Sequence, residues 1–558
     1  MKNRQIYISF LLLISVVLLL LQMFPLSIAA EGEADESVFV FDGKEYKRSK
    51  DVPAIYINGA ENVNVYDYVP CSVVAIDKIG GELKEAADKN ATIRIRGNST
   101  SSGAKRPYNI KFSSNVNLFG MGKGKRYCLI ANMYDPTLLR NHAVFEFARA
   151  IGMEFTLDSM LVDVYVNGSY MGCYQLCEAP TADDDRVDID CDAGDFLIER
   201  DARSDYGTTY FTTMLGHRFG INEPENTTAK QSQDIQDFIR KAEQAIQNRD
   251  YEQVKQYFDI DSMIDMYICM EFFKNVDITV GSTRFYCKNG KIHGGPVWDF
   301  DLSSGNCSSS YYVAYNNNYG DSAEGLWAMH IWFDDLIVYF DEYREAVYAR
   351  YLELQDQIIN LYQDNVLGKN VIDSLIASAS TSIHRNFNEA PWKPWQNYSE
   401  LMRQPDSTYE KNVEYFRAWL ERRNTWLLNH WGIADRVKPK TIDETVSFEG
   451  QYLRGVLPET SVTVFKSLFA EGVSCNSVGN YVSTGDVVRG ESASYYVVID
   501  GDLNQDGNLT VADYLLQKQV LYNNKKVDGA VYQAACGDQQ APNEGICDKI
   551  KRYYFFRK

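Results

Sequence analysis

Two aspartates one residue apart are the first side chains in this sequence that suggest chemistry. Asp299 and Asp301 flank a phenylalanine in the stretch GGPVWDFDLSSGN, residues 294–306. Alternate residues of a β-strand point to the same face, so both carboxylates could ligate one cation where such a strand ends at a cleft. Taken alone, however, the spacing fits two solvent-exposed carboxylates better.

Further side chains make phosphoryl transfer a candidate reaction. That chemistry needs a cation and a basic residue on the phosphate oxygens, and an acid near the acceptor hydroxyl. Asp277 supplies an acid after the apolar segment MIDMYICMEFFKN. Arg96 and Asn98 lie in a polar turn after the strand-like TIRI, and the basic residues Lys105 and Lys111 come next. Donor-rich turns of this type can bind phosphates, although most such turns are plain loops.

A second acidic segment, near the C-terminus, has the spacing of a calcium-binding loop. The stretch DLNQDGNLTVAD, residues 502–513, puts oxygen-bearing side chains at alternate positions and a glycine at the sixth, where the loop must turn sharply. An apolar, helix-like segment, YLLQKQVLY, follows at once. The predicted calcium ligands are Asp502, Asn504, Asp506, Asn508 through its backbone carbonyl, Thr510 and Asp513.

Length and charge disfavour several classes of protein. The chain has 558 residues, 45% of them hydrophobic, which predicts about two to four structural units. Its formal net charge of −20, without a basic stripe, disfavours nucleic-acid and anionic-membrane partners. A basic start, an apolar run over residues 6–24 and small residues before an acidic segment predict a secretory signal, and hence an extracellular protein. An uncleaved membrane anchor is the alternative for this run.

The eleven cysteines follow no metal-binding spacing, so a zinc site is not expected. A secreted chain can form disulfides. We predict that Cys536 pairs with Cys547, because both lie in one short, loop-rich segment. Cys173 and Cys177 lie on an aromatic, strand-like run and are expected to be buried apolar residues.

The order of the expected elements predicts an α+β fold. Alternating, β-branched segments predict strands over the first part of the chain. A helix is expected to end at Gly152, and Asn167-Gly168 predicts a two-residue hairpin turn. The following part is mostly helical, with one hairpin that turns at Asn289-Gly290 and continues as a strand to Phe300. This pattern favours two lobes, a β-rich one and a helical one.

A polar linker and a small β module, from TSVTVFKSLF to ASYYVVIDG, are expected after the helical part. The predicted boundaries are a signal peptide over residues 1–30, a polar leader over 31–50, the two-lobed domain over 51–435, the linker and β module over 436–500, and the calcium-binding module over 501–558.

The C-terminal segment resembles a type I dockerin. A strand precedes its acidic loop in place of an EF-hand helix, and an aspartate stands at the twelfth position. The resemblance covers residues 501–558 and implies binding to a cohesin module of a scaffoldin, as in a cellulosome. Dockerins carry two such repeats, but the second half, AACGDQQAPNEGICDKIKRYYF, lacks the ligand pattern. The Cys536–Cys547 bridge could replace the second ion.

The central region resembles the CotH kinase family, which is related to atypical protein kinases. The resemblance spans residues 51–434, and the order and spacing of its phrases make it specific. It implies a kinase-like, two-lobed fold that binds ATP with Mg²⁺ or Mn²⁺ between the lobes. The phrases are IRIRGNSTSSGAKRPYNIKF, NMYDPTLLRN, LVDVYVNGSYMGCYQLCE, FLIERD, FFKNVDITVGSTRFYCKNGK and GPVWDFDLSSGN.

This second resemblance also implies roles for single residues. Asp299 and Asp301 would hold the Mg²⁺ or Mn²⁺ ion, and Asp277 would act as the catalytic base or as a second metal ligand. Ser282-Thr283 stand where a kinase-like loop would place a metal-binding asparagine, which puts the second metal site in question. The residues on the nucleotide side would be Arg96, Asn98, Glu178, and Lys111 or, as the alternate phosphate-contacting lysine, Lys105.

Three functions fit these features. The first is a secreted protein kinase that transfers the γ-phosphoryl group of ATP to a Ser or Thr of a protein and is tethered by its dockerin. The second is a catalytically silent scaffold or binding module in which the same acids hold Ca²⁺, because ATP is scarce outside cells. The third, a glycoside hydrolase, is disfavoured. Its paired carboxylates would lie roughly 5 to 10 Å apart across a sugar cleft, whereas two same-face acids on one strand are too close and too parallel to flank a glycosidic bond.

Overall fold

A computed structural model describes most of the chain and leaves the predicted signal segment and most of the polar linker outside the described residues. None of the helices in this described part combines the length and apolarity that a membrane-spanning segment needs. The described residues are 37–201, 208–313, 318–365, 368–389, 393, 399–433, 445–449, 452–469, 473–489, 494–523, 530–536 and 544–556.

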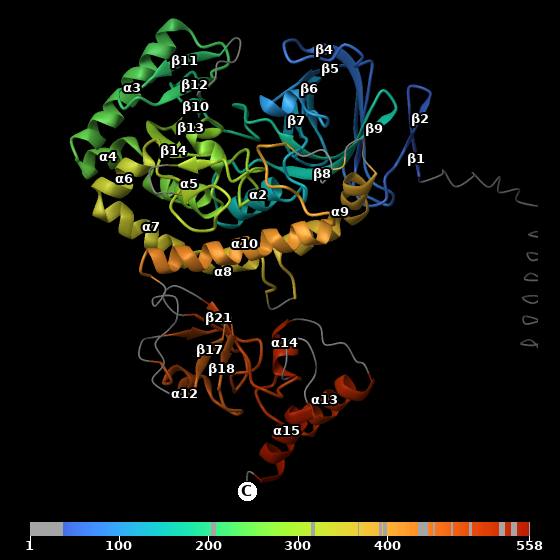
Figure 1. Ribbon diagram of the computed structural model, residues 1–558, viewed down its shortest axis with the longest axis vertical. Coiled ribbons are helices and arrows are strands. Elements are labelled where there is room, and N and C mark those ends of the chain that lie inside the picture. Colours follow the sequence, from blue (N-terminus) through green and yellow to red (C-terminus); the bar gives the residue numbers. More distant parts are fainter. Residues whose placement is uncertain are drawn as a thin grey trace, which may run out of the picture.

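A closed β-barrel forms the first part of the structure, with strand order β3-β4-β5-β6-β7-β9-β8 (Figure 1). Alternate side chains such as Ile93, Ile110 and Leu129 fill its interior, as the two-residue period of a strand requires. Closure pairs every strand of the barrel, so it has no open edge. The strands are β3 (Ala54–Asn58), β4 (Val69–Ile76), β5 (Ala86–Ile95), β6 (Tyr108–Asn117), β7 (Lys123–Ile130), β8 (Ser159–Val166) and β9 (Ser169–Glu178).

Turn residues predicted local structure well. β8 and β9 join through Asn167 and Gly168, whose φ values of 48° and 82° suit the predicted tight hairpin turn. The predicted helix is α2 (Arg140–Ala150), and Gly152 follows it with a φ of 85°. A short hairpin of β1 (Val38–Phe41) and β2 (Lys44–Lys47) precedes the barrel.

A second sheet, ordered β11-β12-β10-β13-β14, lies beside the barrel with helices around it (Figure 1). The predicted α+β class is therefore confirmed, while the two-lobed arrangement stays a prediction. The strands are β10 (Phe196–Arg200), β11 (Thr209–Thr212), β12 (Arg218–Glu223), β13 (Thr283–Lys288) and β14 (Lys291–Gly294). The helices are α3 (Ala229–Gln247), α4 (Tyr251–Tyr257), α5 (Ile260–Phe272), α6 (Phe333–Tyr339), α7 (Asp341–Glu353), α8 (Gln355–Asn360), α9 (Val371–Asn388) and α10 (Tyr409–His430).

The strand expected to reach Phe300 ends earlier. β14 stops at Gly294, and residues 295–300 are irregular. Pro296 has no N–H for a strand ladder, and Asp299 has a left-handed φ of 66°, which a strand cannot accommodate. The prediction that the two acids share one strand face is therefore wrong, and they lie on a loop instead.

The C-terminal elements lie on the other side of α10 from the barrel (Figure 1). Their sheet has the order β17-β18-β21-β20-β19. The segment TSVTVFKSLF, expected to be β, contains the helix α12 (Val462–Lys466), because Ser461 caps its N-terminus and Phe465 packs on Phe469. The other elements are β17 (Ser447–Glu449), β18 (Tyr452–Arg454), β19 (Ser474–Cys475), β20 (Val487–Arg489), β21 (Ser494–Val497), α13 (Val511–Asn523), α14 (Ala530–Ala535) and α15 (Glu544–Phe556).

The predicted Cys536–Cys547 bridge is wrong. Cys536 is a buried free cysteine after α14, and burial raises the pKa of its thiol to about 11. α14 packs through Val531 on the β module, whereas α15 packs through Ile550 on Leu509 of the acidic loop. Cys536, directly after α14, and Cys547, inside α15, therefore belong to helices that pack on different surfaces. Cys173 and Cys177 are buried, as predicted.

A fully buried ion pair joins α5 to α10. Arg423 and Glu271 have no exposed side-chain surface. Arg423 Nη1 also donates to the carbonyl oxygens of Ala323 and Gly325, each at 2.9 Å. Glu271 Oε1 accepts the N–H of Trp327 at 2.8 Å. A buried pair is tolerated only when its remaining donors and acceptors are satisfied, so this pair also fixes the segment between α5 and α6.

Replacing Arg423 by Met should lower the free energy of unfolding by about 3 to 5 kcal/mol, because Glu271 would remain buried without its cation. Denaturant unfolding measures the change. The Glu271→Gln, Arg423→Met double variant should recover part of the loss. Arg422→Met is the matched control, since Arg422 is the exposed neighbour on the same helix. Equal effects of Arg422→Met and Arg423→Met would contradict the prediction.

Candidate functional site

Buried asparagines hold the backbone of the acidic loop, residues 299–306. Asn275 Nδ2 donates to the carbonyl oxygen of Asp299 at 3.1 Å, and Asn141 Oδ1 accepts the N–H of Phe300 at 2.5 Å. Asn306 Nδ2 donates to the carbonyl oxygen of Asp301 at 2.6 Å. All three amides are almost completely buried. They come from α2, from the turn after α5 and from the loop itself, so packing of α2 and α5 positions the acids.

The three candidate acids lie close enough for their charges to interact. Asp301 is 6% exposed. Its burial, together with the charges of Asp299, Asp277 and Asp135, raises the pKa of its carboxyl well above the usual range. Such a shift marks neighbouring carboxylates that repel one another in a poorly solvated place. A bound cation would relieve that repulsion.

Asp277 and Asp299 each form a hydrogen bond with a polar side chain near η2. Asp277 lies in the short 3-10 helix η2 (Val276–Thr279), where Asn275 Oδ1 accepts its N–H at 2.9 Å. Ser282 Oγ donates to Asp299 Oδ2 at 2.8 Å. Ser282, which stands in place of the expected asparagine, thus contacts the acid directly through its hydroxyl.

Two arginine side chains contact the indole ring of Trp298, the residue before Asp299. The guanidinium carbons of Arg96 and Arg284 lie 4.9 Å and 4.8 Å from the centre of the Trp298 ring. Arg284 Nη2 donates to Glu199 Oε1 at 2.9 Å. Burial raises the pKa of Glu199, and the nearby charge of Asp299 adds to the shift. Arg96, at the end of β5, therefore brings the barrel to the acidic loop.

The two candidate lysines differ in their surroundings. Lys111 is partly exposed and points out of the barrel, because its neighbours Ile110 and Phe112 fill the interior. Lys105 has no exposed surface, and its Nζ donates to the carbonyl oxygen of Cys173 at 2.5 Å. Burial lowers the pKa of Lys105 to about 7. Lys105 thus holds the Arg96 turn against β9, and Asn98 lies exposed in that same turn.

Glu178 ends β9 in a buried polar cluster. Its Oε2 accepts the N–H of Asp158 at 2.9 Å, and its Oε1 lies 3.7 Å from Arg186 Nε. Burial raises the pKa of Glu178 to about 7. A Cβ at Gly122 would come within 3.4 Å of Glu178 Oε1 and one at Gly124 would clash with Arg186, so the glycines let the β6–β7 turn close over this pair.

The match to a family model covers most of these residues. The model described as CotH kinase protein matches residues 93–427, more than half of the chain. The chain belongs to the CotH kinase family. A comparison with curated proteins finds no match. The matched region runs from β5 into α10, so the CotH domain contains Arg96, the acidic loop and the helices that hold it.

Sequence reasoning missed several residues of this CotH site. Trp298 directly precedes Asp299, and its type alone gives no hint of two stacked guanidinium groups. Glu199 and Arg284 are 85 positions apart and meet only because β10 and β13 pair in register. The phrases FLIERD and GSTRFYCKNG contain them, which was the available signal.

The C-terminal acidic loop folds back on its last residue. Asp513 Oδ1 accepts the N–H groups of Leu503 and Asn504 at 3.0 Å and 3.1 Å. Asp502 Oδ1 accepts the N–H of Asp506 at 3.2 Å. Burial, with the charges of Asp513 and Asp506, raises the pKa of Asp502 to about 6. Asp502, Asp506 and Asp513 thus lie close enough for their charges to interact.

No group of three or more His, Cys, Asp or Glu side chains in the described ranges is arranged tightly enough to hold a metal ion. In the acidic loop at residues 299–306 and in the C-terminal acidic loop, hydrogen bonds within the protein already use carboxylate oxygens that could ligate a metal. Ser282 donates to Asp299, and the N–H of Asp506 donates to Asp502. The oxygen donors suit hard cations, and a cation would have to replace these hydrogen bonds.

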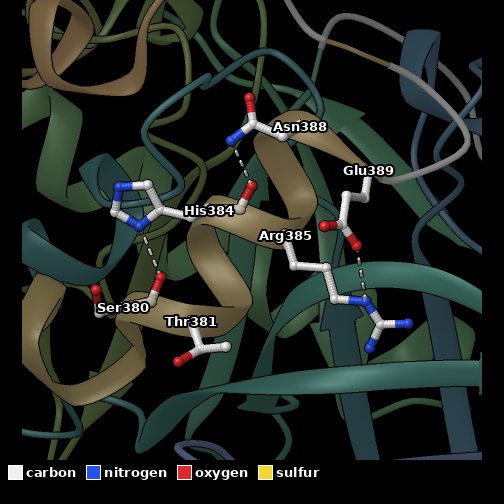
Figure 2. Close-up of a pocket in the computed structure, with 6 residues that line it drawn as sticks. All are labelled: Ser380, Thr381, His384, Arg385, Asn388 and Glu389. Carbon is white, nitrogen blue, oxygen red and sulfur yellow. Dashed lines mark hydrogen bonds and ion pairs between the residues drawn. The ribbon is translucent and has the colours of Figure 1, made fainter.

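A surface hollow of about 490 Å³ lies on α9 (Figure 2). Its charged side chains and its histidine already have partners: Arg385 lies 4.0 Å from Glu389, and His384 Nδ1 contacts the carbonyl oxygen of Ser380 at 2.7 Å. Arg385 also stacks on Tyr170, 3.6 Å from the ring centre. None of these residues belongs to the acidic loop, so we assign the hollow no part in the chemistry.

The raised pKa of Glu178 predicts a pH dependence of stability. The folded protein keeps the proton up to about pH 7, whereas the unfolded chain releases it near pH 4.3. Between these values the folded state binds more protons, so the free energy of unfolding should fall as the pH rises, by about 4 kcal/mol at most. Thermal unfolding of Glu178→Gln should lack this fall. Identical pH profiles of wild type and variant would refute it.

Proposed function

We propose that this CotH-family chain is a secreted protein kinase that transfers the γ-phosphoryl group of ATP to a Ser or Thr hydroxyl of a protein. The convergence of Asp277, Asp299 and Asp301 in a region that matches a kinase family carries this proposal. The contact of Arg96 with the tryptophan next to Asp299 supports it, because it places a cation from the barrel beside the acids.

In this proposal, the three acids have different roles. Asp299 and Asp301 would hold Mg²⁺ or Mn²⁺, which, when bound with ATP, neutralises charge on the phosphate oxygens. Asp277, the more exposed neighbour of Asp301, would accept the proton of the acceptor hydroxyl. Arg96, Asn98 and Lys111 would contact the nucleotide from the barrel, and Glu178 and Lys105 would support that side from buried positions.

We further propose that the C-terminal module is a calcium-binding dockerin that tethers the kinase to a cohesin-bearing scaffoldin outside the cell. The convergence of Asp502, Asp506 and Asp513 supports a calcium loop. The apolar residues Val511 and Leu515 are exposed on α13, which suits a helix that meets a protein partner.

A catalytically silent scaffold is the second candidate function. The contact of Ser282 with Asp299 favours it, since a hydroxyl takes the place expected for a metal-binding asparagine. In that case the same acids would hold a structural cation, and the domain would contribute a binding surface.

Phosphoryl transfer is tested with the full chain, labelled ATP, Mn²⁺ or Mg²⁺ and a generic protein acceptor. Asp277→Ala and Asp299→Ala should each lower the rate by at least about 100-fold, as expected for residues acting on transition-state charge. Asp548→Asn, at an exposed site on α15 paired only locally with Lys551, is the control and should keep the full rate. Wild type that transfers no more label than the two variants would exclude the kinase and favour the scaffold.

The calcium loop is tested by titrating the full chain with Ca²⁺ in a calorimeter. Asp502→Ala should lose at least about tenfold in affinity, because it removes a carboxylate ligand of the loop. Asp548→Asn again serves as the control, since its carboxylate lies outside the loop. An unchanged affinity of Asp502→Ala would reject the assignment of the loop.

A further inference from the structure

We infer that Arg284, on β13, is a phosphate-binding residue of the nucleotide site. This inference rests on the proposed function and adds a residue from the second sheet to the basic residues of the barrel. Arg284 would contact the polyphosphate chain beside Trp298, whose indole ring lies against the guanidinium groups of both Arg96 and Arg284.

The first support is a set of donors without acceptors. The side chain of Arg284 is 6% exposed. Its Nη2 donates to Glu199, but within the described residues neither Nε nor Nη1 has a hydrogen-bond acceptor. A buried donor without an acceptor costs about 1 to 3 kcal/mol, and more when it is charged. A site that receives an anion explains why the chain leaves these donors open.

Arg423 provides a comparison within the same protein. It is buried as deeply and also pairs with a glutamate, Glu271. Its Nε, Nη1 and Nη2 all donate to protein oxygens, among them the carbonyl oxygens of Ala323 and Gly325. Arg423 thus has all its nitrogens satisfied, whereas Arg284 has one of three. Among the residues that the structure describes, buried Arg140 leaves Nε without an acceptor, and buried Arg186 leaves Nε and Nη2.

The surroundings specify the class of ligand. Glu199 fixes one nitrogen of the Arg284 guanidinium, and Trp298 covers its face. A planar fork with open N–H groups binds phosphate oxygens well. Asp299, which influences Glu199 electrostatically, would repel a bare anion. The site therefore suits a phosphate chain that carries its own divalent cation, such as Mg²⁺-ATP, rather than free phosphate.

The test compares ligands that differ only in phosphate number. The full chain is titrated with adenosine, AMP, ADP and ATP in the presence of Mg²⁺, and the quenching of tryptophan fluorescence or the heat of binding gives the affinities. In wild type, affinity should rise from adenosine to ATP. Arg284→Gln should reduce ATP affinity by about 10- to 100-fold, the value of charge-assisted hydrogen bonds, and leave adenosine affinity within about twofold.

Three further variants distinguish a lost phosphate contact from a folding defect. Arg284→Lys retains a cation beside Glu199, so it should fold and lose less ATP affinity than Arg284→Gln. The Glu199→Gln, Arg284→Gln variant avoids an unpaired buried carboxylate and should show the same selective loss. Arg385→Lys is the matched control, because Arg385 also stacks on an aromatic ring and lies beside a glutamate, but on α9.

The outcomes separate the inference from the proposed function. A selective loss of ATP affinity in the Arg284 variants supports the inference. Equal ATP affinities of wild type and the Arg284 variants would overturn it and leave the kinase proposal intact. A parallel loss for adenosine and ATP would show a merely structural arginine and overturn it as well. Wild type that binds none of the nucleotides would reject the proposed function and the inference together.

Discussion

Repulsion among neighbouring carboxylates is the constraint around which the central part of this protein is arranged. Asp301 lies almost out of solvent near Asp277, Asp299 and Asp135. Such charges are costly in a poorly solvated place. The fold holds them together with neutral donors, since buried asparagine amides fix the loop backbone. Rigid amides keep the acids in place, and the cost of bringing them together can be offset by a cation.

Contacts from distant parts of the chain bring counter-charge to this place. Arg96 comes from the barrel, at the end of β5, and Arg284 comes from β13 of the second sheet. Both guanidinium groups use Trp298, the residue next to Asp299, as a common surface. Residues from both sheets therefore meet beside the acidic loop. Buried Lys105 contributes differently, because it anchors the Arg96 turn to β9.

The sequence predicted features that depend on local chemistry. The turns at Asn167-Gly168 and Asn289-Gly290 and the helix before Gly152 follow from propensities within a few residues. Closure of the barrel could not be predicted, because it depends on the parallel pairing of β3 with β8, about a hundred residues apart. The prediction of a strand that carries the acids was wrong because Pro296 has no backbone N–H to donate to a neighbouring strand.

The candidate site shows the same difference between residues found from local sequence and residues brought together by the fold. Type and spacing pointed to Asp277, Asp299 and Asp301, and a resemblance pointed to Arg96. The partners Glu199, Arg284 and Asn141 come together only through strand register and helix packing. The disulfide prediction failed because nearness along the chain was taken for nearness in space. Cys536 follows α14 and Cys547 lies inside α15, and these two helices have different packing surfaces.

The C-terminal acidic loop is attached to more than its own helix. Asp502 accepts the N–H of Thr484, and the carbonyl oxygen of Gly507 accepts the N–H of Glu459. Both partners belong to the β module, and Tyr553 on α15 donates to Pro458. Mechanical load applied at α13 would therefore enter the β module through several parallel hydrogen bonds. The acidic loop, α15 and the β module would therefore resist a pulling force as one stiff block.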